Sequence, residues 1–104
     1  MATWLPLGVA AEATDLTIHA ARAGDHDVVA VRVGDSWSVF ADRCTHADCS
    51  FTDLGEIEDG VLICNCHGAE FDLTTGGVLQ DPAEEPLVLL PVEVREGELF
   101  VLLG

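Results

Sequence analysis

The sequence predicts an all-β protein built from short antiparallel strands. Apolar and polar residues alternate with a period of two at residues 16–20, as in a strand with one buried face. Turns containing glycine or aspartate separate short runs of β-branched residues, which is typical of hairpins. Pro82, Pro86 and Pro91 follow Gly76-Gly77 and argue against a long helix in the second half of the chain. Many short strands joined by turns indicate a sandwich or a small barrel.

Three hairpins are expected, each with a turn signal between two apolar runs. The turn sequences Asp59-Gly60 and Glu96-Gly97 favour tight connections, because glycine accepts the positive φ that such turns require. Residues 9–15 are expected to form at most one helical turn. The strand pairs and their turns are 29–33 with 37–40 around Gly34-Asp35-Ser36, 56–58 with 61–63 around Asp59-Gly60, and 92–94 with 99–102 around Glu96-Gly97.

The length and charge of the chain limit its possible partners. A chain of 104 residues is expected to form a single domain, residues 1–104. It carries 19 acidic and 4 basic residues, a formal net charge of −15. Such a surface repels phosphate backbones and anionic lipid, so neither nucleic acid nor membrane is an expected partner. The charge favours docking onto basic protein surfaces, with solubility alone as the alternative reading.

No segment of the sequence resembles a membrane span or a targeting leader. A bilayer span needs about 20 apolar residues, whereas the longest apolar stretch near the C-terminus, 87–92, is short and contains Pro91. The first residues lack a basic region followed by an apolar one, and they lack a twin arginine. A cytoplasmic location is therefore expected.

Two groups of cysteine and histidine residues carry the chemistry of the sequence. Cys44 and His46 form a C-x-H pattern, and Cys64 and His67 form a C-x-x-H pattern. A binuclear iron–sulfur centre with two thiolates on one iron and two imidazoles on the other uses this set of ligands. The expected hairpin at Asp59-Gly60 lies between the groups and would bring the two loops side by side. Loops on a rigid scaffold are where such sites are usually found.

The combined pattern C-T-H-x-x-C and C-x-C-H-G resembles the signature of the Rieske family. The resemblance covers residues 43–82 and implies a Rieske-type fold of antiparallel sheets, with a cluster-binding subdomain inserted at 43–82. It implies that Cys44, His46, Cys64 and His67 hold one Rieske-type [2Fe–2S] cluster.

The same resemblance implies a disulfide between Cys49 and Cys66. This pair ties the two loops together in quinol-oxidising and some other Rieske proteins, whereas many soluble Rieske ferredoxins lack it. Because a disulfide is unusual in a reducing cytoplasm, it would have to be shielded, or else the two residues would stay as thiols. The disulfide is the expectation. The segment 81–83, Asp-Pro-Ala, resembles the proline-containing loop that covers the cluster in this family.

Ala69 and Phe71 indicate a low reduction potential. Quinol-oxidising members resembling this chain have a serine and a tyrosine at these positions, whose hydroxyls donate hydrogen bonds to cluster sulfur. Neither Ala69 nor Phe71 can donate from its side chain. Without donors the reduced cluster is disfavoured, so the potential is expected in the lower half of the Rieske range of roughly −150 to +300 mV.

Other interpretations of these residues are less favoured. Zinc sites prefer C-x₂₋₄-C pairs, and C-x-H is too tight for the usual spacing. Two plain disulfides would leave His46 and His67 unexplained. The remaining histidines, His19 and His26, are interpreted as surface residues, and Trp37, like Trp4, as a packing residue.

The resemblance implies a function as a soluble one-electron carrier that is not itself an enzyme. The expected role is the ferredoxin of a ring-hydroxylating dioxygenase system in aromatic hydrocarbon catabolism. It would pass electrons from an NAD(P)H-dependent ferredoxin reductase to a terminal oxygenase, as a monomer docking through its acidic surface. Two alternatives stay open. One is the small Rieske subunit of assimilatory nitrite reductase, and the other is the Rieske subunit of a quinol- or arsenite-oxidising complex, which the Cys49/Cys66 pair favours.

Overall fold

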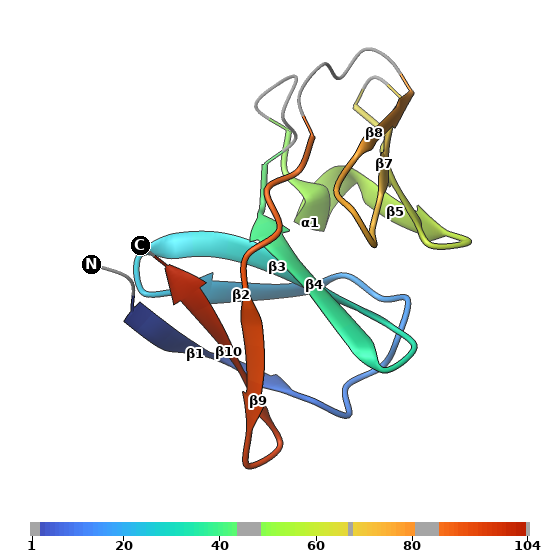
Figure 1. Cartoon of the computed structure of the whole chain (residues 1–104). Helices are drawn as coiled ribbons and strands as arrows, with labels where there is room; N and C mark the ends of the chain where they lie inside the picture. The colour runs from blue at the N-terminus through green and yellow to red at the C-terminus, as the bar shows by residue number, and fades with distance from the viewer. Residues whose placement is uncertain (1–2, 44–48, 67, 81–85, 104) are drawn as a thin grey trace.

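Three antiparallel sheets make up the computed structural model of the chain (Figure 1), which confirms the all-β prediction. The structure describes residues 3–43, 49–66, 68–80 and 86–103. Sheet A has the strand order β1-β10-β9, sheet B the order β2-β3-β4, and sheet C the order β5-β6-β7-β8. In chain order the elements are β1 (Thr3–Ala10), β2 (His19–Ala23), β3 (His26–Val33), β4 (Ser36–Ala41), α1 (Phe51–Leu54), β5 (Gly55–Glu58), β6 (Val61–Cys64), β7 (Ala69–Asp72), β8 (Val78–Gln80), β9 (Val92–Arg95) and β10 (Glu98–Leu103).

The three hairpins expected from the sequence are all present. β3 pairs with β4, β5 with β6, and β9 with β10, each in antiparallel register. Asp59 and Gly60 have φ values of 49° and 77°, and Glu96 and Gly97 have values of 50° and 79°. Positive φ at both central residues is the geometry of a two-residue turn whose twist matches that of its strands. The turn chemistry thus fixes the register of β5 against β6, next to the expected cluster loops.

The N-terminal part of the chain differs from the sequence-based prediction. The strand expected at 16–20 begins only at His19, and Leu16 lies before it with a φ of 51°. The Leu16 amide donates to the carbonyl of Arg32 at 2.8 Å, and the Arg32 guanidinium donates to the carbonyl of Ala13 at 3.3 Å. These bonds hold the segment as a loop against the end of β3, so its alternating pattern does not produce a strand.

Residues 9–15 stay within the limit of one helical turn expected from the sequence, and the first two of them belong to β1. β1 extends to Ala10, which pairs with Glu98 of β10 after an irregularity in the register. Because β1 and β10 come from opposite ends of the chain, their pairing cannot be predicted from the local sequence pattern. The edge strand β1 therefore takes residues that look weakly helical in isolation.

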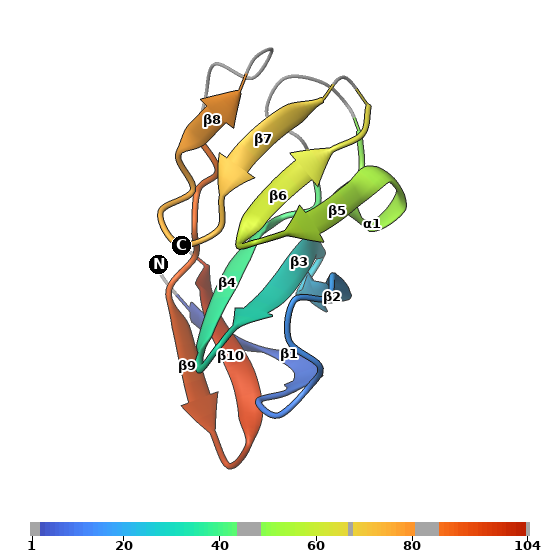
Figure 2. The same cartoon turned by 90° about the vertical axis from the view of Figure 1, so that its right-hand side faces the viewer.

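Sheet B is the central layer of the molecule (Figure 2). In β3, Val28 and Ala30 pack in a core cluster with residues of sheet A, whereas Val29 and Val31 pack in a second cluster with residues of sheet C. All four side chains are at most 2% exposed. A short continuous apolar run is the pattern of a strand buried on both faces, which explains why residues 28–31 do not alternate.

Sheet C and α1 lie on the side of sheet B away from sheet A (Figure 2). They follow residue 43 and precede residue 81, so they carry the segment in which the sequence predicts a cluster. No helix in the ranges that the structure describes is long and apolar enough to span a bilayer.

Candidate functional site

One of the four predicted cluster ligands lies in the described part of the chain. Cys64 is the last residue of β6, its side chain is fully buried, and its thiol is free. The predicted ligands Cys44, His46 and His67 lie outside the described residues, as does the expected covering loop at 81–83. The site is therefore built from the residues that flank and hold the predicted loops.

The predicted disulfide between Cys49 and Cys66 is present. It joins the segment before α1 to the segment after β6, with 6.4 Å between the two Cα atoms. Both cysteines are half-buried and pack against the core between sheets B and C. The bond leaves Cys44 and Cys64 as the cysteines outside it, and the free thiol of Cys64 excludes the alternative of two plain disulfides.

A carboxylate clamp closes the first predicted loop at its base. Asp42 follows β4, and its Oδ1 accepts a hydrogen bond from the Thr52 amide at 2.9 Å. Its Oδ2 accepts one from the Thr52 hydroxyl at 2.6 Å and one from the Ser50 hydroxyl at 3.1 Å. The residues just before and after the segment 43–49 are thereby held together, which restricts the loop that carries Cys44 and His46.

Ser50 has a second role in this clamp, because it is the N-cap of α1. Its Oγ accepts a hydrogen bond from the Thr52 amide at 3.1 Å, and its backbone is extended. Neither the role of Asp42 nor the short helix α1 was predicted from the sequence. The signal was the pattern Ser-x-x-Asp at residues 50–53, which is typical of a capped helix start.

The second predicted loop is held by backbone bonds and by one long polar side chain. The Asn65 amide donates to the carbonyl of Leu54 at 2.9 Å, and the Gly68 amide donates to the carbonyl of Cys64 at 2.8 Å. Gln80 Nε2 donates to the Gly68 carbonyl at 3.0 Å, and Gly68 has a φ of 83°. A residue other than glycine is strained at this φ, so the turn depends on Gly68. The contribution of Gln80 depends on the pairing of β7 with β8 and has no signature in the sequence.

Ala69 and Phe71 lie on the inner face of sheet C, and both are fully buried. In the register Ala69 is opposite Cys64, and Phe71 is opposite Leu62. The Phe71 ring packs edge-on against Phe51 of α1 at a centroid distance of 6.1 Å. Phe51 in turn packs edge-on against Phe40 of β4 at 5.5 Å. Phe71 is thus part of the packing between sheets, and neither it nor Ala69 presents a polar side-chain group near Cys64.

His19 and Trp37 contribute to packing at the start of β2, on the opposite side of the molecule. His19 Nε2 donates to the Thr14 carbonyl at 2.7 Å, and its ring lies 5.7 Å from the Trp37 ring. Trp37 Nε1 donates to the Ala11 carbonyl at 3.3 Å. Both side chains hold the loop that precedes β2, so their polar atoms are engaged in backbone contacts.

The described residues fit an iron–sulfur cluster in their donor chemistry. A ligand thiolate must be free of disulfide bonds, and a cluster is best retained where water is excluded. Cys64 meets both conditions, since it is free and buried at the base of a turn tied to the neighbouring loop. The clamp at Asp42 joins the residues on either side of the first predicted loop, and the disulfide joins the segment before α1 to the segment after β6.

Comparisons with known proteins cover nearly the whole chain. Residues 3–96 match the Rieske [2Fe–2S] domain family. The chain is 34% identical over 99 residues to ferredoxin CarAc of Metapseudomonas resinovorans, covering 94% of this chain and 92% of the relative. It is 31% identical over 104 residues to the anthranilate 1,2-dioxygenase ferredoxin subunit of Burkholderia cepacia, covering 100% of this chain and 95% of the relative.

Solved structures of ferredoxins and of a ferredoxin complex share the fold of this chain. The chain superposes with a TM-score of 0.82 and 34% identity on a chain from a complex of reduced oxygenase and oxidized ferredoxin in carbazole 1,9a-dioxygenase, covering 94% of this chain and 91% of that one. A ferredoxin from Sphingomonas yanoikuyae B1 shares the fold with a TM-score of 0.85 at 24% identity, covering 95% of this chain and 97% of that one.

Proposed function

The chain belongs to the Rieske [2Fe–2S] domain family, and we propose that it carries single electrons from an NAD(P)H-dependent reductase to a terminal aromatic-ring-hydroxylating oxygenase. The observation that carries this proposal is the match, over more than nine-tenths of both chains, to ferredoxin components of dioxygenase systems. Such components transfer electrons and leave catalysis to their partners. The Rieske family implies one [2Fe–2S] cluster in this domain.

The residues proposed to hold the cluster are Cys44, His46, Cys64 and His67. The spacing C-x-H and C-x-x-H supports this set, as do the burial and the free thiol of Cys64. When bound, the cluster supplies the redox couple that accepts and releases one electron. The chain supplies the ligands, the tie between the loops through the disulfide, and a buried apolar base under Cys64.

We infer a reduction potential in the lower half of the Rieske range, which spans roughly −150 to +300 mV. Ala69 and Phe71 are buried beside the Cys64 strand and offer no side-chain donor to a cluster sulfur. Donors of this kind stabilise the added electron, so their absence favours the oxidised state. A low potential suits reduction by a nicotinamide-linked reductase.

The proposed setting is the cytoplasm, with the protein acting as a soluble monomer. Its net charge of −15 supports docking on basic surfaces of the reductase and the oxygenase, because complementary charge accelerates association. The half-buried positions of Cys49 and Cys66 are consistent with a disulfide that is partly shielded from cytoplasmic reductants.

A second candidate is the Rieske subunit of a quinol- or arsenite-oxidising complex. The Cys49–Cys66 disulfide favours it, because such a bond is typical of high-potential relatives. Ala69 and Phe71 oppose it, since the donors that raise the potential are missing at these positions. The small subunit of an assimilatory nitrite reductase is a further alternative, and no described contact distinguishes it.

Electron transfer with purified partners tests the proposal. The iron-loaded protein is mixed with NADH, a reductase and the oxygenase component of carbazole 1,9a-dioxygenase, and product formation is followed with and without the protein. The proposal predicts that product formation depends on the protein and saturates with its concentration. A protein that is reduced but never oxidised by the oxygenase would contradict it.

A further inference from the structure

The two faces of sheet C differ sharply in chemistry. In an antiparallel sheet, residues paired across strands share a face. One row of pairs, Ile57–Leu62–Phe71–Val78, lies on the face that packs against sheet B. The neighbouring rows, Glu56–Ile63–Glu70–Gln80 and Glu58–Val61–Asp72, therefore lie on the opposite face.

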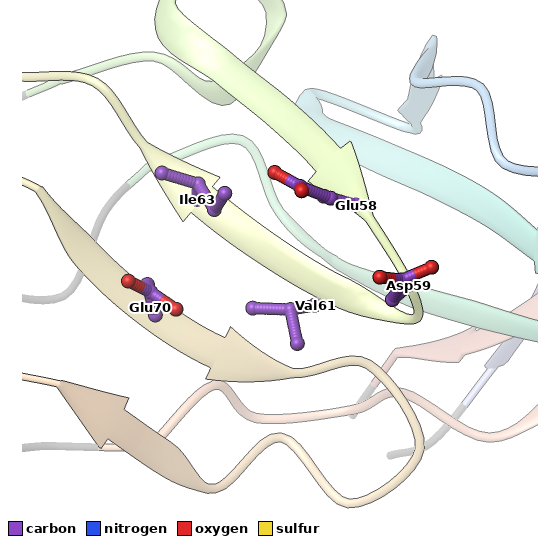
Figure 3. A pocket seen from close by; sticks show the side chains of 5 residues that line it. All are labelled: Glu58, Asp59, Val61, Ile63 and Glu70. Carbon is purple, nitrogen blue, oxygen red and sulfur yellow. The ribbon is translucent and has the colours of Figure 1, made fainter.

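This opposite face is a shallow hollow with acidic side chains around two apolar ones (Figure 3). Val61 and Ile63 of β6 lie in the middle and are half-buried. Glu58 and Asp59 lie on one side of them and Glu70 on the other (Figure 3). Glu56 is added by its pairing with Ile63. We name the face formed by these residues the acidic sheet face: Glu56, Glu58, Asp59, Val61, Ile63 and Glu70.

The carboxylates of this face have no cationic partner among the described residues. Glu56, Glu58, Asp59 and Glu70 take part in no ion pair or side-chain hydrogen bond in that part of the chain. The segment 55–80 contains no lysine or arginine. By contrast, Arg22 pairs with Asp27 on sheet B at 3.1 Å and Arg95 with Glu93 on sheet A at 2.9 Å.

Such an arrangement is unfavourable for the isolated domain. The carboxylates of β5 and β7, the two strands that flank β6, repel one another, and the two β-branched apolar side chains of β6 between them are only half covered. Both features become favourable when a basic surface with an apolar centre covers the face. A protein with a basic surface is therefore complementary in charge to this face. Nucleic acid and anionic lipid are negatively charged and would be repelled by it.

The acidic sheet face also lies close to the proposed cluster. Ile63 immediately precedes Cys64, and Glu70 immediately follows Ala69, which pairs with Cys64. One residue along a strand is about 3.3 Å. A protein seated on the face would thus contact the two strands that carry Cys64 and Ala69.

We propose that the acidic sheet face is a docking surface for the terminal oxygenase, which covers it with arginine or lysine side chains around an apolar residue. This inference rests on the proposed function. The oxygenase is the assigned occupant because the 34% identical ferredoxin chain comes from a complex with an oxygenase. The reductase is the competing occupant, and the test distinguishes the two.

The test compares two pairs of charge-neutralising substitutions in the iron-loaded protein. The variant E58Q/E70Q removes two charges from the face. The matched control E12Q/D35N removes two charges from exposed residues that take part in no side-chain hydrogen bond or ion pair among the described residues. Each variant must first show an unchanged visible spectrum. The dissociation constants for the oxygenase component of carbazole 1,9a-dioxygenase and for the reductase of the electron-transfer assay are then measured by calorimetry at low and at physiological ionic strength.

The proposal predicts that E58Q/E70Q weakens oxygenase binding about 10-fold at low ionic strength, and less as salt is added. The control pair should change binding less than about 2-fold. An I63T variant should weaken binding at both salt concentrations, because its effect comes from apolar contact.

Three results would overturn the docking surface. Equal weakening by both pairs would mean that net charge alone matters. Unchanged oxygenase binding by E58Q/E70Q would place the interface elsewhere, and a loss confined to reductase binding would make the reductase the occupant. If the unsubstituted protein neither binds nor reduces the oxygenase, the proposed function itself is contradicted.

Discussion

Sheets B and C are both antiparallel, yet they bury their residues differently. In β3 of sheet B, four consecutive side chains are at most 2% exposed, because sheet A covers one face and sheet C the other. In β6 of sheet C, Leu62 and Cys64 are fully buried while Val61 and Ile63 are half-exposed. Packing covers four consecutive residues of β3, whereas it covers only alternate residues of β6.

The difference distinguishes sheet B, which forms the scaffold, from sheet C, which carries the proposed cluster ligand Cys64. In sheet B, the middle of β3 is covered by sheet A on one face and by sheet C on the other. Sheet C has one face on the core, one face free, and the two predicted cluster loops at its end. The two regions meet at the rings of Phe40, Phe51 and Phe71. Substitutions in sheet B should therefore affect stability alone, and those in sheet C should affect the cluster or its partners as well.

The largest effect is expected at Cys64. The substitution Cys64→Ser changes one atom of a buried side chain and removes a proposed thiolate ligand. We expect loss of the Rieske visible and EPR spectra and a fall in bound iron to near zero. Iron analysis and EPR of the purified variant measure this. A retained Rieske spectrum would refute the ligand assignment, and Ser38→Ala in sheet B should leave the spectrum unchanged.

The next effect is expected at the aromatic contact between the two regions. Phe51→Ala removes a fully buried ring that touches Phe40 on one side and Phe71 on the other. Its free energy of unfolding should fall by about 3–5 kcal/mol, measured by urea denaturation. Val88→Ala, at a residue that is 74% exposed, is the matched control and should change it by less than about 0.5 kcal/mol. Equal effects of the two would show that the rings do not join the layers.

A somewhat smaller effect is expected from the disulfide. The double variant C49A/C66A removes the bond between the two loops, which are 17 residues apart at this point. Closing a loop of this length restricts the unfolded chain, and its loss should cost about 3 kcal/mol. Denaturation of the protein with and without a thiol reductant provides an independent measurement. If neither treatment lowers stability, the bond does not constrain the chain in solution.

The smallest effect is expected at the carboxylate clamp. Asp42→Ala removes the acceptor of the Thr52 and Ser50 hydroxyls and should cost about 1–2 kcal/mol of unfolding free energy. Asp35→Ala, in an exposed turn, is the control. The clamp also holds the base of the first loop, so the variant should lose iron faster to a chelator than the control does. Identical rates would limit the clamp to a role in capping α1.

The sequence was sufficient for those parts of the fold that depend on local chemistry. Asp59-Gly60 and Glu96-Gly97 carry the positive φ values of their turns, so the hairpins could be predicted from a few residues. β1 pairs with β10 across the whole chain, and such long-range pairing leaves no local pattern. At residues 16–20 the alternating pattern predicted a strand that begins only at His19, because hydrogen bonds with Arg32 hold the segment around Leu16 as a loop.

In the candidate site, too, features with a local sequence pattern could be predicted, and features that depend on folding could not. The resemblance to the Rieske signature implied the disulfide, which the structure confirms, and the ligand set, which remains a prediction. The roles of Gln80 and Asp42 could not be predicted from the sequence, because their hydrogen-bond partners are brought close only by folding. The acidic residues were recognisable, but only the strand register shows that Glu56, Glu58 and Glu70 share a face with Ile63.

Potentiometric titration of the purified, iron-loaded protein, followed by EPR, tests the central claim most directly. The account predicts a Rieske signal that appears on reduction, with a midpoint in the lower half of the range of roughly −150 to +300 mV. A midpoint near the top of that range would contradict the role as a ferredoxin reduced by a nicotinamide-linked reductase. A protein without a Rieske signal when prepared anaerobically would contradict the cluster itself.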